Sequence, residues 1–233
     1  MYIPFQIMVD PVGNRRLFIG DMHGCLAEVN DLLEKFAFRP GKDALFSVGD
    51  VVGKGPDVPG TLGRLRELKA TVVRGNHDQY LLNVAQTPED NRTPKDMEYL
   101  ASLRSEAAVW IAHIATWPAY VELPDIIMVH GGLEPGKLKL ADMSERILMK
   151  IRTWDGKGDI LQKAGDPPWF QCVTTDKIVV FGHWAERGLI DLPNFKGLDT
   201  GCVYGGKLTG WCPEENRFIQ VPARKAYTSI HRH

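Results

Sequence analysis

The chain has 233 residues, a formal net charge of −1 and a hydrophobic content of 44%. These values are ordinary for a soluble globular protein, and the length predicts one domain over residues 1–233 rather than two small ones. The near-zero charge gives no reason to expect nucleic acid or a membrane surface as a partner. No stretch approaches the roughly 20 apolar residues that a membrane span needs.

The four cysteines are scattered and include no Cys-x-x-Cys pair. This usage indicates buried thiols in a reducing compartment, with a Cys202–Cys212 disulfide as the alternative. The N-terminus has no basic region followed by an apolar run, so we expect no signal peptide and a cytoplasmic protein. If the native N-terminus is longer, the expectation of a cytoplasmic protein without a signal peptide no longer follows.

The first part of the chain alternates between apolar runs and segments with helical periodicity. Strands are expected at residues 16–19, 44–48 and 70–73, and helices at residues 25–36 and 61–69. This order predicts a largely parallel sheet covered by helices. Loops that follow consecutive parallel strands meet at one edge of such a sheet, at its carboxyl end.

The second part of the chain predicts a cap and a further set of strands. Residues 86–116 begin with a polar loop that contains prolines and continue as one helical stretch over 97–116, which indicates a small cap beside the site. Strand-like runs follow at residues 119–123, 126–129 and 178–181, with short antiparallel strands in 188–221. We therefore expect an α/β fold in which two packed mixed β-sheets are flanked by helices.

Five glycine-flanked segments carry the chemistry of the chain. Each places Asp, Asn or His beside glycine after an apolar run: Gly20-Asp21-Met22-His23-Gly24, Gly49-Asp50-Val51-Val52-Gly53-Lys54-Gly55, Gly75-Asn76-His77-Asp78, Val129-His130-Gly131-Gly132 and Gly182-His183. One such segment would be weak evidence, because aspartate beside glycine is common in turns. Five in this order supply nitrogen and oxygen ligands for two metal ions.

The spacing indicates which side chains share an ion. Asp21 and His23 can face one ion from a tight turn, and Asp50 can bridge two ions with its two oxygens. The second ion would be completed by a neutral amide and two imidazoles, from Asn76, His130 and His183. Two ions roughly 3.5–4 Å apart clamp both oxygens of an in-line displacement, and the water between them becomes a hydroxide that attacks phosphorus. Mn²⁺ is expected first, with Fe, Zn or Co as alternatives.

Together the segments resemble the signature of the phosphoprotein phosphatase superfamily, in its calcineurin-like metallophosphoesterase fold. Over about residues 17–209 the chain looks closest to bacterial diadenosine tetraphosphatases and eukaryotic ApaH-like phosphatases. Three features carry that preference: Asp78 after Gly-Asn-His, the segment 181–185, and the segment 198–209. Lys54 in place of Arg, and two glycines after His130, differ from the bacterial pattern and are familiar in the eukaryotic group, which includes enzymes that act on other phosphoanhydrides.

The resemblance implies roles for further residues. His77 would be the general acid, with Asp78 orienting and charging its imidazole. Lys54 would hold a substrate phosphate. Arg152 and Tyr204 are candidates for the remaining phosphates or the base, and Arg74 is a substrate-binding candidate for which a structural role is an equal alternative.

The reaction implied is the cleavage of a phosphoanhydride or phosphoester in a phosphorylated small molecule, with symmetrical hydrolysis of diadenosine tetraphosphate (Ap4A) to ADP as the first expectation. A serine/threonine protein phosphatase acting on phosphoproteins is one alternative, and His130-Gly131-Gly132 fits it. Another is a polyphosphate or mRNA cap hydrolase, although near-neutral charge disfavours long polyanions. A non-catalytic metal-binding scaffold would require the loss of a ligand or of the acid, and none is lost.

Overall fold

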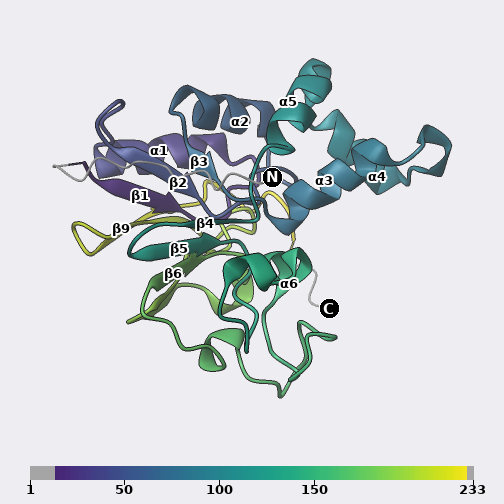
Figure 1. Ribbon diagram of the computed structural model, residues 1–233. Helices are drawn as coiled ribbons and strands as arrows, with labels where there is room; N and C mark the ends of the chain where they lie inside the picture. Colours follow the sequence, from purple (N-terminus) through teal and green to yellow (C-terminus); the bar gives the residue numbers. More distant parts are fainter. Residues whose placement is uncertain (1–13, 230–233) are drawn as a thin grey trace.

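The structure of the protein, a computed structural model, describes residues 14–229 and contains two five-stranded β-sheets packed against each other (Figure 1). The first sheet has the order β10-β9-β1-β2-β3, with β1 at Arg16–Ile19, β2 at Ala44–Ser47, β3 at Thr71–Val72, β9 at Lys207–Cys212 and β10 at Arg217–Pro222. The second has the order β4-β5-β6-β8-β7, with β4 at Tyr120–Glu122, β5 at Ile126–Val129, β6 at Ile178–Phe181, β7 at Ile190–Leu192 and β8 at Phe195–Gly197.

Both sheets are mixed, as the sequence predicts. Strands β1, β2 and β3 are parallel, and β9 adds to β1 in the antiparallel direction. In the second sheet β5, β6 and β8 are parallel, while β4 and β7 lie antiparallel at its edges. The parallel strands at the centre of each sheet therefore deliver their following loops to one edge of the sandwich.

The helices lie outside the sandwich. Their bounds are α1 at Leu26–Phe36, α2 at Val58–Glu67, α3 at Asn76–Gln86, α4 at Pro94–Ala101, α5 at Ala107–Ile114 and α6 at Glu145–Lys150. In Figure 1, α1 and α2 cover the outer face of the first sheet, and α6 lies beside the second. Helices α3, α4 and α5 form a lobe at one end of the molecule, which we call the helical lobe.

The alternation of side chains along the strands explains why the sheets are covered on both faces. In β1, Leu17 and Ile19 pack into the core under the helices, whereas Phe18 points to the core between the sheets. The second sheet repeats this pattern: Met128 enters the inter-sheet core, and Val129 packs on the opposite side. Period-2 strands with two apolar faces need cover on each face, and the sandwich with outer helices provides it.

Two helix predictions were wrong in their bounds. Helix α2 begins at Val58 rather than at residue 61, because Asp57 accepts a hydrogen bond from the backbone N–H of Gly60 and Pro59 suits a first turn. The single helical stretch expected over 97–116 is two helices, α4 and α5, separated by a short 3₁₀ turn in which Arg104 has a φ of 56°.

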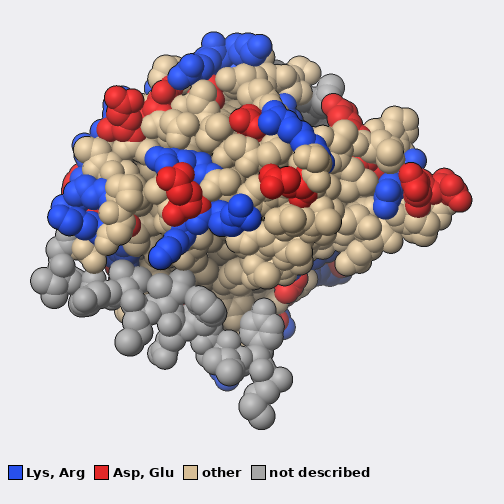
Figure 2. Space-filling view, turned by 90° about the horizontal axis from the view of Figure 1, so that it is seen from above, with Lys and Arg blue, Asp and Glu red and all other residues tan. Residues whose placement is uncertain are grey.

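All four cysteines are free thiols, so the alternative of a Cys202–Cys212 disulfide does not hold. Within residues 14–229, no helix is long and apolar enough to cross a membrane. Figure 2 shows the face seen from above the helices, where basic and acidic side chains alternate over the described surface. That mixture of signs does not favour an extended polyanion on this face.

Candidate active site

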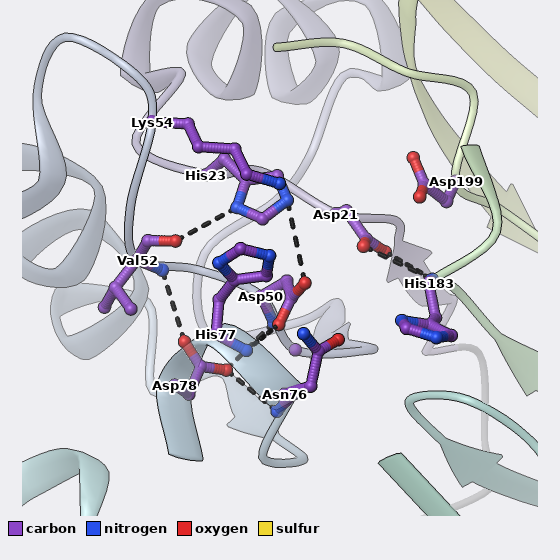
Figure 3. Close-up of polar contacts among 12 residues, drawn as sticks. Asp21, His23, Asp50, Val52, Lys54, Asn76, His77, Asp78, His183 and Asp199 are labelled. Carbon is purple, nitrogen blue, oxygen red and sulfur yellow. Dashed lines mark hydrogen bonds and ion pairs between the residues drawn. The ribbon is translucent and has the colours of Figure 1, made fainter. Parts of the chain in front are cut away.

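The five glycine-flanked segments meet at one edge of the sandwich. Three follow the parallel strands β1, β2 and β3, and two follow the parallel strands β5 and β6 of the other sheet. They surround a small pocket of about 60 Å³ that is lined by Asp21, His23, Asp50, Lys54, Asn76, His77, Arg152, His183, Ala185, Asp199 and Tyr204. Figure 3 shows most of these side chains turned toward a common centre. The pocket is far smaller than the roughly 300 Å³ of an ordinary small-molecule site, so it suits ions and a phosphoryl group rather than a nucleoside.

Backbone strain is concentrated in these segments. Among the described non-glycine residues, His23, Asp50, Lys54 and His183 have φ angles of 45°, 49°, 62° and 68°. Such left-handed conformations cost of the order of 1–3 kcal/mol each and persist only where the surrounding structure imposes them.

One carboxylate oxygen lies at the centre of the site. Asp50 Oδ2 is 3.6 Å from His23 Nε2 and 3.4 Å from His130 Nε2. The other oxygen, Oδ1, accepts the backbone N–H of His77 at 2.8 Å. One oxygen therefore faces both histidines while the second is held by the backbone, and bridging of two ions by Asp50 stays a prediction.

Carbonyl groups fix the tautomer of two histidines. His23 Nδ1 is 3.0 Å from the oxygen of Val52, and His130 Nδ1 is 2.9 Å from the oxygen of Val48. A ring that donates Nδ1–H to a carbonyl presents Nε2 as a lone pair, which is how metal-binding histidines are usually oriented. Because His130 Nε2 also lies 3.0 Å from Asn76 Oδ1, several electron-pair donors converge on one point.

The opposite side of the site is built around Asp21 and His183. The backbone N–H of His183 donates to both oxygens of Asp21, at 3.2 and 3.3 Å. His183 Nε2 is 3.1 Å from the oxygen of Lys150, which leaves Nδ1 for the site. Gly182 makes this approach feasible, because a Cβ there would lie 2.0 Å from Asp21 Oδ1.

The buried carboxylates of the site create an electrostatic potential that favours a bound cation. Burial and the charge of Asp199 raise the pKa of Asp21 well above its usual range. Burial would also raise the pKa of Asp50, but the histidines around it hold the value well below normal. Burial lowers the pKa of His130, yet Asp50 and Asp21 outweigh it and raise the value to about 10. The field at this point therefore favours a cation, and the oxygen and imidazole donors fit divalent ions.

Asp78 does not contact the imidazole of His77. Its buried carboxylate instead accepts backbone N–H bonds from Asp50, Val51, Val52 and Gly75, at 2.9, 3.1, 3.2 and 2.9 Å. The expected role of orienting and charging the acid is thus corrected: Asp78 ties the loop after β2 to the start of α3. Neighbouring helical residues point in different directions, so adjacency in sequence does not place the two side chains together.

The nitrogen that Asp78 was expected to hold has another partner. His77 Nδ1 forms a hydrogen bond with the hydroxyl of Tyr99, which comes from α4. Burial lowers the pKa of His77 to about 4, with Lys54 adding to this effect and Asp50 opposing it. The protein groups alone therefore keep this ring neutral.

Three of the four expected substrate-binding groups, Lys54, Arg152 and Tyr204, line the pocket, and the fourth does not. Lys54 Nζ donates to the hydroxyl of Tyr204 at 2.6 Å, and Arg152 Nη2 donates to the carbonyl oxygen of His183 at 3.1 Å. Arg74 instead pairs with Glu145 of α6 at 2.8 Å and does not line the pocket. This ion pair fits the structural alternative for Arg74, and its substrate-binding role stays a prediction.

Two site residues were missed as functional groups. Asp199 follows β8 and has Gly201 two residues later, so part of the signal was present, although β8 itself contains Lys196 and is not an apolar run. Burial raises the pKa of Asp199 beside Asp21. Tyr99 had no such signal, because it lies inside an ordinary amphipathic helix.

Comparisons with known proteins agree with this geometry. The family model described as calcineurin-like phosphoesterase matches residues 15–206. The chain is 31% identical to the symmetrical bis(5'-nucleosyl)-tetraphosphatase of Shewanella oneidensis, covering 87% of this chain and 96% of that protein. It is also 31% identical to the enzyme of the same name from Aromatoleum aromaticum, covering 91% and 98%.

Solved structures give the same result. A crystal structure assigned provisionally to a diadenosine tetraphosphatase superposes with a TM-score of 0.80 at 31% identity, covering 92% of this chain and 96% of that one. A serine/threonine phosphatase of Saccharomyces cerevisiae superposes with a TM-score of 0.54 at 15% identity, covering 94% and 81%. The second match shows a shared fold and nothing further.

Proposed function

The chain belongs to the calcineurin-like phosphoesterase family of metal-dependent phosphohydrolases, and we propose that it hydrolyses dinucleoside polyphosphates, splitting Ap4A symmetrically into two ADP. The observation that carries this proposal is the convergence of the donor groups on one edge of the sandwich. The names of relatives that match over most of both chains supply the substrate.

The six donor residues would hold two divalent ions, for which we propose Mn²⁺ first because oxygen and imidazole donors suit it. They are Asp21, His23, Asp50, Asn76, His130 and His183. When bound, the ions supply Lewis acidity and an activated water for attack on phosphorus.

The positions of the cationic side chains suit a central phosphoanhydride. Lys54 lies beside His23, whereas Arg152 binds the backbone of His183 on the opposite side of the donor set (Figure 3). A tetraphosphate whose middle bond lies at the centre would place phosphates toward both cations. The pocket of about 60 Å³ leaves the two nucleosides outside it. Symmetrical cleavage follows from this two-sided grip.

His77 is placed to serve the leaving group. Its backbone N–H is fixed by Asp50, and its ring lies among the donor groups at the pocket wall. We propose that the ring takes up a proton when the polyphosphate binds and that its site-facing nitrogen passes this proton to the oxygen that leaves with ADP, which returns the ring to its neutral form.

The test is a substrate panel with purified protein and each of Mn²⁺, Zn²⁺, Co²⁺ and Mg²⁺. Ap4A should yield ADP as the sole nucleotide product by ion-exchange chromatography. Products of ATP and AMP would contradict the symmetrical grip. Turnover of an aryl phosphate or a phosphopeptide without turnover of Ap4A would remove the dinucleotide and retain the phosphohydrolase.

A further inference from the structure

Beyond the first turn of α3, one side chain of the helical lobe lies at the edge of the active site. Tyr99 of α4 is only 7% exposed, and its hydroxyl meets His77 Nδ1. The two rings are nearly parallel, at 12°, with centroids 6.0 Å apart. Tyr99 does not line the pocket, so it reaches the reaction only through His77.

We propose that Tyr99 is a positioning residue that fixes the orientation and tautomer of the His77 imidazole. This inference rests on the proposed function, in which His77 is the acid. In the resting neutral ring, a hydroxyl that donates to Nδ1 leaves the ring proton on Nε2. In the imidazolium that acts as the acid, Nδ1–H donates to the phenol oxygen instead, so the same contact keeps Nε2–H directed at the leaving oxygen, and loss of that proton leaves a neutral ring. The partner is a neutral phenol, because burial and the charge of Asp50 raise the pKa of Tyr99 above its usual value. It therefore supplies direction to the ring without adding charge.

The chain makes room for this phenol at Gly53, in the loop after β2. A Cβ at Gly53 would lie 2.9 Å from the Tyr99 hydroxyl oxygen and 3.1 Å from the ring. A side chain at that position would therefore displace the phenol from His77. The glycine of the metal-binding loop and the tyrosine of the lobe form one arrangement, although 46 residues separate them in the sequence, from 53 to 99.

Contacts inside the lobe hold the phenol in place. The ring of Tyr80 packs edge-on against Tyr99, with centroids 4.8 Å apart and planes at 77°. The hydroxyl of Tyr80 donates to Asp96, which also caps the start of α4 together with Thr93. A pre-positioned partner costs little to order when the reaction occurs, which is the condition for effective positioning.

Tyr99→Phe removes the hydroxyl and keeps the ring, and Tyr80→Phe is the matched control. We expect Tyr99→Phe to lower kcat for phenyl phosphate by about 10-fold or more, with KM nearly unchanged. The loss should be roughly 3-fold or less for p-nitrophenyl phosphate, whose leaving group needs less protonation. Tyr80→Phe should keep kcat and lower the unfolding temperature. In a His77→Asn background, Tyr99→Phe should have no further effect.

The decisive measurement does not depend on activity. In Zn²⁺-loaded protein labelled with ¹⁵N-histidine, the His77 signals, identified by their absence in His77→Asn, should report protonated Nε2. Tyr99→Phe should shift that population toward the other tautomer while both proteins retain equal zinc. Identical His77 signals in wild type and Tyr99→Phe would overturn the inference, and so would equal kcat losses for both aryl phosphates. Failure to hydrolyse Ap4A, by contrast, would leave this spectroscopic test intact and remove only the proposed substrate.

Discussion

The metal-binding edge of the sandwich and the helical lobe contribute to the site in different ways. The edge supplies every predicted metal donor, each on a segment that follows a parallel strand, and all except Asn76 are held by backbone contacts. The lobe, apart from its first turn, supplies a single phenol that touches none of the proposed metal donors. The comparison separates two proposed roles: the sheets hold the metal donors that set the reaction, and the lobe positions the acid that delivers the proton.

The largest expected effect is at the edge. Asp50→Asn should lower kcat/KM for Ap4A by at least about 10³-fold, because its Oδ2 lies between His23 and His130. Metal analysis of the same protein should show fewer than two bound ions per chain. Asp31→Asn, an exposed carboxylate on α1 that pairs with Arg224, is the control and should retain both ions. Full activity in Asp50→Asn would contradict the assignment of Asp50 and its neighbours at this edge as metal donors.

A second variant separates the acid from the metal donors. His77→Asn should reduce kcat by about 10²-fold or more while both ions remain bound, since proton transfer contributes about 10²–10⁴-fold. Steady-state kinetics and metal content measured on one preparation check this. Loss of metal in this variant would instead indicate that His77 is a metal ligand.

Lys54 and Arg152 are proposed to bind phosphates on opposite sides of the scissile bond, and removing either should have an effect between those of the metal-donor and surface variants. Lys54→Met and Arg152→Met should each raise KM for Ap4A by about 10-fold, because each removes one charged contact worth about 1.5–3 kcal/mol at most. The same substitutions should change KM for p-nitrophenyl phosphate much less, since that ester has a single phosphate. Equal changes for both substrates would contradict binding on both sides of the scissile bond.

The smallest effect is expected at Arg74. Arg74→Ala breaks the pair with Glu145, which is largely exposed, so the free energy of unfolding should fall by no more than about 1 kcal/mol. Because Arg74 does not line the pocket, kcat and KM should stay within about twofold of wild type. A large rise in KM would restore the role that the sequence suggested for it.

Local signals in the sequence were sufficient to predict the sheets and the meeting of the five glycine-flanked segments at one edge. An apolar run that ends beside glycine and aspartate, asparagine or histidine marks a strand whose following loop reaches the site, whereas Asp199 follows a strand that contains a lysine and a glycine. Strand bounds such as Arg16–Ile19, Ile126–Val129 and Ile178–Phe181 agree with the apolar runs residue for residue. These features depend on neighbours in the sequence, which is why they can be read from it.

Other features depend on direction or on distant partners. Arg74 directly precedes a predicted metal-binding segment, yet its side chain pairs with Glu145 of α6. The break between α4 and α5 occurs at Arg104, without proline or glycine to announce it. The contact between His77 and Tyr99 joins two helices across 22 residues, from 77 to 99, and no periodicity specifies it.

The four backbone bonds of Asp78 have a consequence for ion exchange. They join the loop that carries Asp50 to the turn that carries Asn76, using only protein groups. The shape of the site is therefore held without help from its ions, in contrast to small domains that fold only when metal binds. Chelation should empty such a site reversibly, and the cell's supply of divalent ions, rather than the folding of the chain, would then decide which ion the protein carries.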